Sequence, residues 1–354
     1  MKRLADICDI QYGYAFDSKC FTEDSSYPQL VRIRDVKRGY SETYYSGDYP
    51  EEYILSEGDL LIGMDGEFNI ARWKCSGALL NQRVCKLTTK VGTNEEYLRF
   101  AMLKSLKEIE QRTAFVTVKH LSVKELNKLE LDVPELTKQD KIADTLSRLE
   151  RVIEARKEEL EKLDNLIKAR FVEMFGDPRS NPFGFSKSVL KDTCKVVTGN
   201  TPLRAVQEYY GNYVEWIKTD NIVSEMINPT KATESLSEEG MKVGRTVDKD
   251  SILMACIAGS IASIGKVCVT DRTVAFNQQI NAIVPEEYNI LFLYVLLQLS
   301  KDYLIEDINM ALKGILSKSK LEEKEFIVPP MELQKQFADF VDQVDKSKVI
   351  KLSN

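Results

Sequence analysis

A long, uninterrupted helical pattern occupies the middle of the chain. From Thr137 to Phe175 the sequence contains neither glycine nor proline, and a Gly-Asp-Pro stop follows. Its apolar residues recur at alternating steps of four and three, as in the seam of a coiled coil, and only Arg156 and Arg170 interrupt them. The 39 residues predict a helix of roughly 58 Å. The predicted seam consists of Ile142, Leu146, Leu149, Ile153, Leu160, Leu163 and Ile167, followed by Met174.

A shorter amphipathic pattern begins near Met331 and carries Phe337, Val341 and Val344 at the same spacing. An amphipathic helix cannot bury its apolar seam by itself. The long helix is therefore expected to pair either with a helix of another chain or with this second helix folded back along it, antiparallel, and we favour the second arrangement. Because the second helix is shorter, the remaining end of the long helix would need a further partner, such as a second copy of the chain.

The sequence also contains an internal duplication with an offset of about 195 residues. Residues 129–146 align without gaps to residues 324–341, and each copy places a Val-Pro pair five residues ahead of a glutamine. Each copy therefore predicts a globular domain followed by a helix. The predicted boundaries are 1–134 and 177–330 for the two globular domains, 135–176 for the long central helix and 331–354 for the shorter helix.

Within the globular segments the pattern changes to short strands and one longer helix per copy. β-branched and apolar runs predict strands, and the helices lie at corresponding places late in each copy. The fold class predicted is α+β, with two mixed α/β domains related by duplication and separated by long coiled-coil helices. The predicted strands lie at 27–36, 83–89, 265–270 and 280–285, and the predicted helices at 94–111 and 289–308.

Composition narrows the class of protein. No apolar run approaches the roughly 20 residues that a membrane helix needs. The seven cysteines form no CxxC pair, so we expect reduced, buried thiols and a cytoplasmic protein. A single histidine, His120, leaves little material for a zinc site or a His-based triad. The net charge is −6, and no segment of the chain is strongly basic. This argues against a DNA-binding protein that acts alone but allows a local basic face.

Two segments suggest catalysis at first sight, and neither fits. The stretch IAGSIASIGKV at 257–267 suggests a phosphate-binding loop, but its glycines are one residue too far apart and Val267 stands where a hydroxyl is required. In the other copy, Ala71 and Arg72 align with Gly265 and Lys266, so we expect a glycine turn and a strand edge. The NPFG run at 181–184 is similar to an amino-methyltransferase motif but lacks its second proline and a glycine-rich cofactor loop. We therefore expect no catalytic site in this chain.

The ordered motifs resemble the specificity (S) subunit of type I restriction–modification systems. The resemblance covers essentially the whole chain, and its one departure is the short second helix. It is carried by Val133-Pro134 with Gln139, Val328-Pro329 with Gln334, the Asn81-Gln82 and Asn277-Gln278 pairs, and the helix exit at 170–185.

The resemblance implies a division of labour. Each globular half would be a target recognition domain that reads one half of a split DNA sequence, and the helices would fix the spacer between the half-sites. The helices would also dock two methyltransferase (M) subunits that bind S-adenosylmethionine and methylate adenine. Restriction (R) subunits would add ATP- and magnesium-dependent translocation and cleavage in phage defence. In this family the S subunit has no catalytic site or cofactor of its own.

Candidate DNA contacts are basic, aromatic or amide residues in strand-edge and loop positions. The densest cluster is 30–40 in the first half, with 214–222 as its counterpart. The alternative for the first cluster is a solvated strand face, and for Trp73 a place in the core. Because the Asn-Gln pairs occur in both halves, we expect them to be structural, while Arg83 and Gln279 differ and could discriminate. The candidates are Arg32, Arg34, Lys37, Arg38, Arg72, Trp73, Lys74, Arg83, Lys119, Trp216, Lys218, Lys266, Gln279 and Lys313.

One alternative function remains open from the sequence. A coiled-coil adaptor with two docking domains that bind no DNA would show the same helices and the same duplication. Salt-dependent binding to duplex DNA, together with a methyltransferase partner, would separate the two hypotheses, because an adaptor predicts no such dependence.

Overall fold

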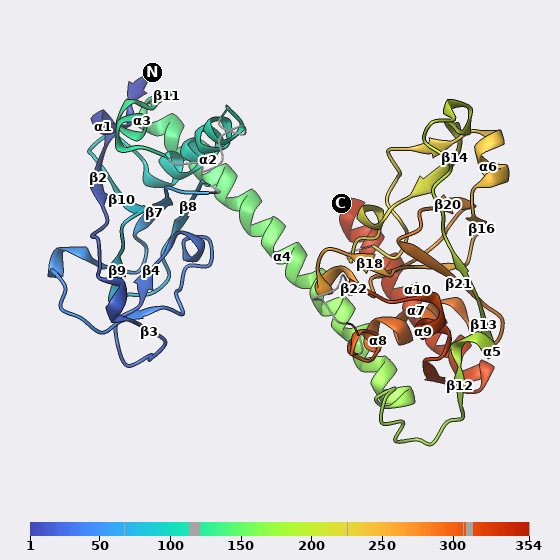
Figure 1. The fold of residues 1–354 in the computed structure, drawn as a ribbon. Helices are drawn as coiled ribbons and strands as arrows, with labels where there is room; N and C mark the ends of the chain where they lie inside the picture. Colours follow the sequence, from blue (N-terminus) through green and yellow to red (C-terminus); the bar gives the residue numbers. More distant parts are fainter. Residues whose placement is uncertain (67, 113–120, 225, 307, 309–313, 354) are drawn as a thin grey trace. The chain divides into compact units, whose positions relative to one another are not determined.

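The computed structural model describes residues 1–66, 68–112, 121–224, 226–306, 308 and 314–353. The chain divides into two compact units, Met1–Ala155 and Arg156–Asn354. The long helix α4, Leu136–Phe175, contributes its first half to one unit and its second half to the other (Figure 1). The predicted helix at 137–175 is therefore confirmed almost to the residue.

Unit 1 is built around an antiparallel sheet of four strands in the order β2-β10-β7-β8. The central strand β7 is buried on both faces: Leu60 and Ile62 join a core beneath helix α2, and Leu61 joins a second core on the opposite face. The strands are β1 Lys2–Arg3, β2 Cys8–Tyr12, β3 Phe21–Thr22, β4 Leu30–Val31, β5 Tyr44–Tyr45, β6 Ile54–Leu55, β7 Leu60–Gly63, β8 Asn69–Arg72, β9 Ala78–Leu80, β10 Val84–Thr89 and β11 Glu130–Leu131, and the helices are α1 Leu4–Ile7, α2 Glu95–Arg112 and α3 Val123–Lys128.

Unit 2 repeats this plan with the strand order β13-β21-β17-β19, and helix α7 takes the place of α2. Strand β17 is again buried on both faces, with Ile252 on the α7 side and Leu253 on the other. The strands are β12 Lys187–Val189, β13 Cys194–Thr198, β14 Tyr210–Ile217, β15 Ser235–Leu236, β16 Thr246–Val247, β17 Ile252–Ala255, β18 Ile257–Ala258, β19 Val267–Val269, β20 Val274–Phe276, β21 Ile280–Pro285, β22 Gly314–Ile315 and β23 Glu325–Ile327, and the helices are α5 Leu190–Thr193, α6 Glu238–Val243, α7 Ile290–Leu299, α8 Lys301–Ile305, α9 Lys318–Glu322 and α10 Met331–Ser353.

Two predicted elements are wrong in detail. The strand expected at 27–36 is limited to Leu30–Val31, and a short 3-10 helix, η2, follows at Ile33–Asp35. This helix forms because the Asp35 carboxylate accepts the Arg32 backbone N–H at 2.9 Å, which turns the chain out of the sheet. The helix expected at 289–308 is two helices, α7 and α8, which meet at Ser300. The segment 257–267 forms β18, a 3-10 turn and a glycine at positive φ, as expected for a turn ahead of a strand.

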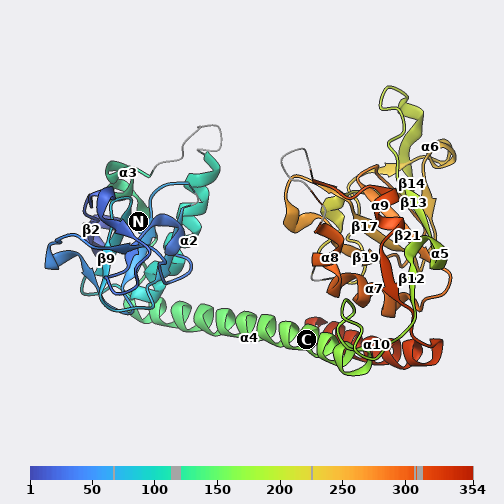
Figure 2. The same cartoon turned by 60° about the horizontal axis from the view of Figure 1, so that its bottom comes forward.

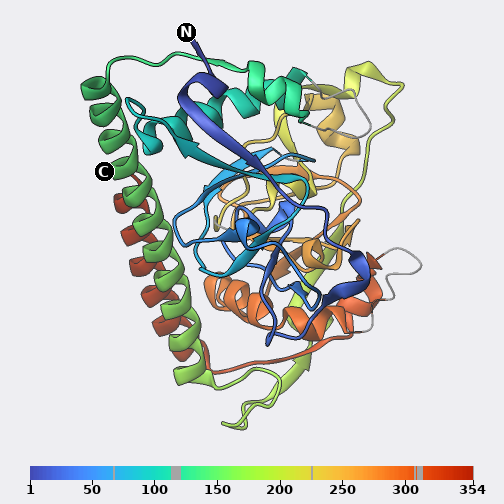
Figure 3. The same cartoon turned by 90° about the vertical axis from the view of Figure 1, so that its left-hand side faces the viewer.

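The second half of α4 pairs with α10 in an antiparallel arrangement inside unit 2 (Figures 2 and 3). Asp164 forms an ion pair with Lys348, and seven residues later on α4 the Phe171 ring lies 5.4 Å from that of Phe337. Residue numbers therefore increase along α4 while they decrease along the part of α10 that faces it, so the two helices are antiparallel. Of the predicted seam residues, Ile167, Phe337, Val341 and Val344 are buried together in one core. The favoured pairing of the two helices is confirmed.

The first half of α4 has a different environment. Leu149 and Ile153, which the periodicity places on the seam, are 53% and 56% exposed. Ile142 and Leu146 are half-buried. The apolar seam, interrupted in sequence only at Arg156 and Arg170, is thus covered only in part by the described residues.

The repeated glutamine locks each long helix to its own domain. In unit 1, Gln139 Oε1 accepts the Asn94 backbone N–H at 2.9 Å, and Gln139 Nε2 donates to the Pro134 carbonyl at 2.8 Å. In unit 2, Gln334 makes the same pair of bonds with Asn289 and Pro329, at 2.9 and 2.8 Å. Both glutamines are buried. The Val-Pro…Gln motif therefore joins the start of α4 or α10 to the N-terminus of α2 or α7.

Candidate nucleic-acid interface

In unit 1, two loops leave the same edge of a parallel strand pair. Strands β4 and β9 are parallel, with Val31 opposite Leu80, so that segments 32–34 and 81–83 continue side by side. They line a cavity of about 480 Å³, here called the arginine pocket. The lining residues are Phe16, Ser18, Phe21, Arg32, Ile33, Arg34, Asn81, Gln82 and Arg83.

The first loop is held by the buried carboxylate of Asp35. It accepts the Arg32 backbone N–H and the Ser41 hydroxyl, each at 2.9 Å, and lies 3.8 Å from the Arg34 guanidinium. The backbone of this loop is therefore fixed, while the side chains of Arg32 and Arg34 are exposed. A fixed backbone carrying exposed guanidinium groups suits the recognition of phosphate or of base edges.

The second loop is clamped against the end of β2. The Gln82 N–H donates to the Tyr14 carbonyl at 2.8 Å, and the Gly13 N–H donates to the Val84 carbonyl at 3.0 Å. A Cβ atom on Gly13 would lie 2.0 Å from the Asn81 carbonyl oxygen, so only glycine allows this approach. Arg83 has φ +73°, a strained conformation for a residue with a side chain.

Unit 2 contains the same frame. Strands β14 and β20 are parallel, with Ile217 opposite Phe276, and the segments that follow are 218–220 and 277–279. The Lys218 N–H is held by Asn221 at 3.0 Å, as Arg32 is by Asp35. A Cβ on Gly199 would lie 2.1 Å from the Asn277 carbonyl, as at Gly13. The duplication therefore extends to the construction of the loops.

The side chains on the second frame are tied to one another. Glu234 pairs with Lys218 and with Arg204, the latter at 2.6 Å, and these hydrogen bonds hold the pKa of Glu234 below its ordinary value. The guanidinium of Arg204 lies 4.9 Å from the centre of the Trp216 ring. The Gln278 amide accepts the Thr201 hydroxyl. The predicted contact Lys218 is thus engaged by its own domain in this structure.

The structure corrects several predicted contacts. Trp73 and Trp216 are 1% and 3% exposed and lie in the cores, so their rings do not face a ligand. Arg72 turns towards helix α2, where it pairs with Glu95 at 3.0 Å and with Glu96. Arg32, Arg34 and Arg83 are brought together, while Lys37, Arg38 and Lys74 are exposed outside the pocket, and Gln279 is half-buried. Lys119 and Lys313 lie outside the described residues.

Arg72 instead begins a series of ion pairs that joins strand β8 of unit 1 to helices α2 and α4. Arg99 on α2 pairs with Glu96 at 2.8 Å and binds both carboxylate oxygens of Glu150 on α4, at 3.1 and 2.5 Å. Burial acts to raise the pKa of Glu96, but hydrogen bonds from Arg99 and Arg72 outweigh it and hold that pKa below its ordinary value. The sequence offered Arg72 as a DNA contact because it does not show which face of a strand a helix covers.

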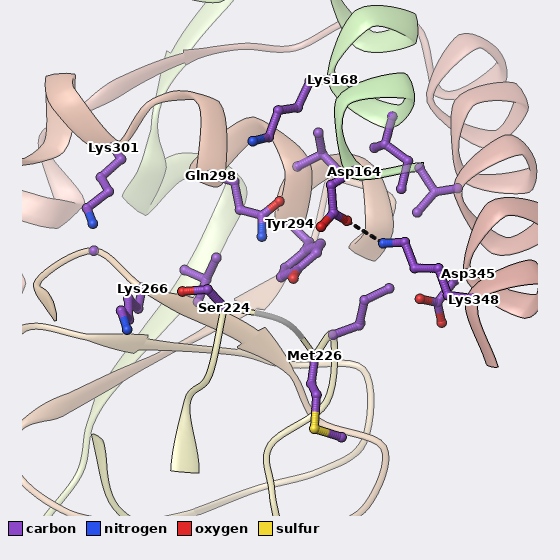
Figure 4. A pocket seen from close by; sticks show the side chains of 16 residues that line it. Asp164, Lys168, Ser224, Met226, Lys266, Tyr294, Gln298, Lys301, Asp345 and Lys348 are labelled. Carbon is purple, nitrogen blue, oxygen red and sulfur yellow. Dashed lines mark hydrogen bonds and ion pairs between the residues drawn. The ribbon is translucent and has the colours of Figure 1, made fainter. Parts of the chain in front are cut away.

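At the corresponding place, unit 2 has a cavity of about 210 Å³ (Figure 4). The offset of 195 residues found at 129–146 also relates Arg99 to Tyr294 and Glu150 to Asp345, and Lys266 aligns with Arg72. All three line the cavity, with the Asp164–Lys348 ion pair at its α10 side. Burial raises the pKa of Asp345. Lys266, a predicted phosphate contact, therefore lies at a cavity that is also lined by helices α4, α7 and α10.

Sequence reasoning missed Phe16, Ser18 and Phe21, which complete the arginine pocket. Their only signal was an aromatic run just after Gly13, at the position where the other copy has Gly199.

Within the part of the chain that the structure describes, no group of three or more His, Cys, Asp or Glu side chains could hold a metal ion. No described helix has the length and apolar character needed to cross a membrane.

Comparison with known proteins gives a consistent result. The family model described as type I restriction modification DNA specificity domain matches residues 1–165 and 182–353. The chain is 39% identical over 166 residues to the specificity subunit of the type I restriction enzyme EcoBI from Escherichia coli, covering 47% of this chain and 35% of that protein. It is 32% identical over 120 residues to the HindI specificity subunit from Haemophilus influenzae, covering 33% of this chain and 25% of that protein.

The fold has a solved counterpart. The type I restriction–modification S subunit from M. genitalium superposes with a TM-score of 0.60 at 14% identity, covering 99% of this chain and 90% of that one. The identity is low, so this likeness concerns the fold. The sequence matches to the two curated relatives span about a third or less of their length.

Proposed function

Because this chain belongs to the family of type I restriction modification DNA specificity domains, we propose that it is the DNA-recognition subunit of a type I restriction–modification complex. In this proposal each unit reads one half of a bipartite DNA target, and the chain itself carries out no chemistry. The alternative, a coiled-coil adaptor that binds no DNA, has no observation in its favour.

One observation carries the proposal. Both units hold two loops at the ends of a parallel strand pair, on the same backbone frame but with different side chains. Arg32 and Arg83 in the first unit stand where Lys218 and Gln279 stand in the second. A backbone arrangement that is repeated in both units, with different side chains on its loops, suits a protein that applies one docking geometry to two different base sequences. The target is therefore expected to be asymmetric.

The proposal includes partners and cofactors. Two methyltransferase subunits would dock on the long helices, where Leu149, Val152 and Ile153 are exposed apolar residues that a partner could cover. Those subunits would bind S-adenosylmethionine, and restriction subunits would supply ATP and magnesium. A cytoplasmic location fits the seven free cysteines, several of them buried; burial raises the pKa of Cys85 to about 12.

A domain exchange tests the proposal. Residues 1–134 are replaced by the matching domain of a relative, and the chimaera is expressed with its methyltransferase subunits. Because each unit would read its own half-site, methylated adenines mapped across the genome are expected to show a change in one half of the motif only.

The controls are the parent chain and the reciprocal exchange of 177–330, which is expected to change the other half alone. An unchanged motif in both chimaeras would contradict the proposal. DNA binding by the complex is also expected to weaken steeply with salt, whereas an adaptor predicts no such slope.

A further inference from the structure

The two units treat the equivalent asparagine in opposite ways. In unit 2, Asn277 Nδ2 donates to Gln279 Oε1 at 3.1 Å, and the Gln279 N–H donates to Asn277 Oδ1 at 3.1 Å. In unit 1, Asn81 is only 7% exposed, and Asn81 Oδ1 is buried without a hydrogen-bond partner among the described residues. The same amide is therefore hydrogen-bonded within its own loop in one unit, whereas in the other its buried oxygen lacks a partner among the described residues.

The residue two positions later accounts for one of these hydrogen bonds, the one that the amide nitrogen donates. Gln279 has a side-chain carbonyl that can accept from the asparagine amide. Its counterpart Arg83 has donors only, so it cannot accept a hydrogen bond from Asn81 Nδ2. The Asn81 amide nitrogen therefore lacks the side-chain acceptor that Gln279 provides in unit 2, and Asn81 lines the arginine pocket.

The chemistry of the pocket distinguishes two kinds of ligand. A DNA phosphate offers acceptors only, so it would satisfy the guanidinium groups but would leave the Asn81 oxygen without a donor. The major-groove edge of a base pair offers both acceptors and a donor. Guanine presents its N7 and O6 acceptors, which fit an arginine fork, and the paired cytosine presents an amino donor. The combination of guanidinium groups with an unpaired amide therefore fits a G·C pair better than the backbone.

We infer that the arginine pocket reads a G·C pair in the first half-site through its guanidinium groups and the Asn81 amide, and that Arg83 is the specificity-determining residue of this pocket. The inference rests on the proposed function, because it assigns a base pair to one of the two recognition units. The second unit has the locked form of the same site and reads its half-site with other groups.

The test uses the second unit as its template. Arg83→Gln gives the first unit the residue that hydrogen-bonds Asn277 in the second. The Arg83 side chain is 52% exposed and its ion pair with Asp65 spans 3.5 Å at the surface, so the fold is expected to persist without it. The full complex is tested on duplexes carrying the mapped target, with 7-deazaguanine placed at each guanine of the first half-site in turn. Removal of one N7 is expected to weaken binding about 5- to 150-fold for the parent complex. The Arg83→Gln complex is expected to bind more weakly than the parent but to be insensitive to that replacement.

The control Lys107→Gln removes the same charge from helix α2 and is expected to keep the parent's sensitivity to 7-deazaguanine. In genome-wide maps, Arg83→Gln is expected to relax one base pair of the first half-site and none of the second. An unchanged motif, or equal sensitivity of the parent and Arg83→Gln complexes to 7-deazaguanine, would overturn the inference while leaving bipartite recognition intact. Failure of the parent complex to methylate any bipartite motif would instead overturn the proposed function.

Discussion

Gly13 shows how a single missing side chain shapes the arginine pocket. Gly13→Ala would place a methyl group 2.0 Å from the Asn81 carbonyl, against backbone that has no room to rotate away. The loop 81–83 must therefore shift, and we expect a destabilisation of about 1–3 kcal/mol. Chemical denaturation would measure the stability, and binding to duplexes with separately altered half-sites is expected to show weaker discrimination in the first half-site only.

Gly259→Ala is the matched control. Its Cβ would meet no atom within 4 Å, and its φ is not in the left-handed region. Its stability is therefore expected to change by less than about 1 kcal/mol. If Gly13→Ala were as stable as Gly259→Ala and equally discriminating, the close approach would not shape the pocket.

At this scale the sequence predicted the three pocket arginines, because charge and loop position can be recognised locally. It could not predict the burial of the two tryptophans, which depends on packing partners distant in the chain.

The helix-locking glutamines act at the scale of elements. Gln139→Met keeps the volume and helix propensity of the side chain but removes its hydrogen bonds to Asn94, Gly92 and Pro134. Because the site is buried, the partners lose their hydrogen bonds without gaining water, and we expect a cost of about 1–3 kcal/mol. Amide exchange should show faster exchange at Asn94, where α4 is joined to α2, with helix α7 unaffected.

Gln334→Met is expected to have the corresponding effect in unit 2: the Asn289 amide should exchange faster, and the exchange rate of the Asn94 amide should not change. Gln343→Met, on the exposed side of α10, serves as control and is expected to leave both amides protected. Equal protection of Asn94 in Gln139→Met and in the parent would show that the motif does not hold the helix.

The elements also show where sequence reasoning succeeds. The helix over 136–175 was predictable because its period persists for many turns with no competing signal. The strand at 27–36 was not, since one buried carboxylate, Asp35, bends the chain by a contact that apolar alternation does not reveal. The split of the helix at Ser300 was missed for a related reason: no glycine or proline marks it, and the turn depends on the domain around it.

On the scale of the whole molecule, the continuous helix α4 is the feature that carries both units. Seven residues inserted between Ala155 and Arg156 would leave intact the Arg99–Glu150 contact on one side and the Asp164–Lys348 pair on the other. The insertion lengthens the helix by about 10.5 Å and returns its face to within about 20° of the original direction. Since B-DNA rises about 3.4 Å per base pair, the spacer of the methylated motif is expected to grow by about three base pairs, or binding to be lost.

Genome-wide mapping of methylated adenines would measure the spacer directly. A constant-length control, Lys162→Gln, removes one exposed charge from the same helix and is expected to keep the original spacer. Methylation by the lengthened chain at the original spacing would show that the helix does not set the distance between half-sites. A shifted spacer with both half-site sequences unchanged would instead separate the two properties, because recognition would then reside in the loops of each unit and spacing in the helix that joins them.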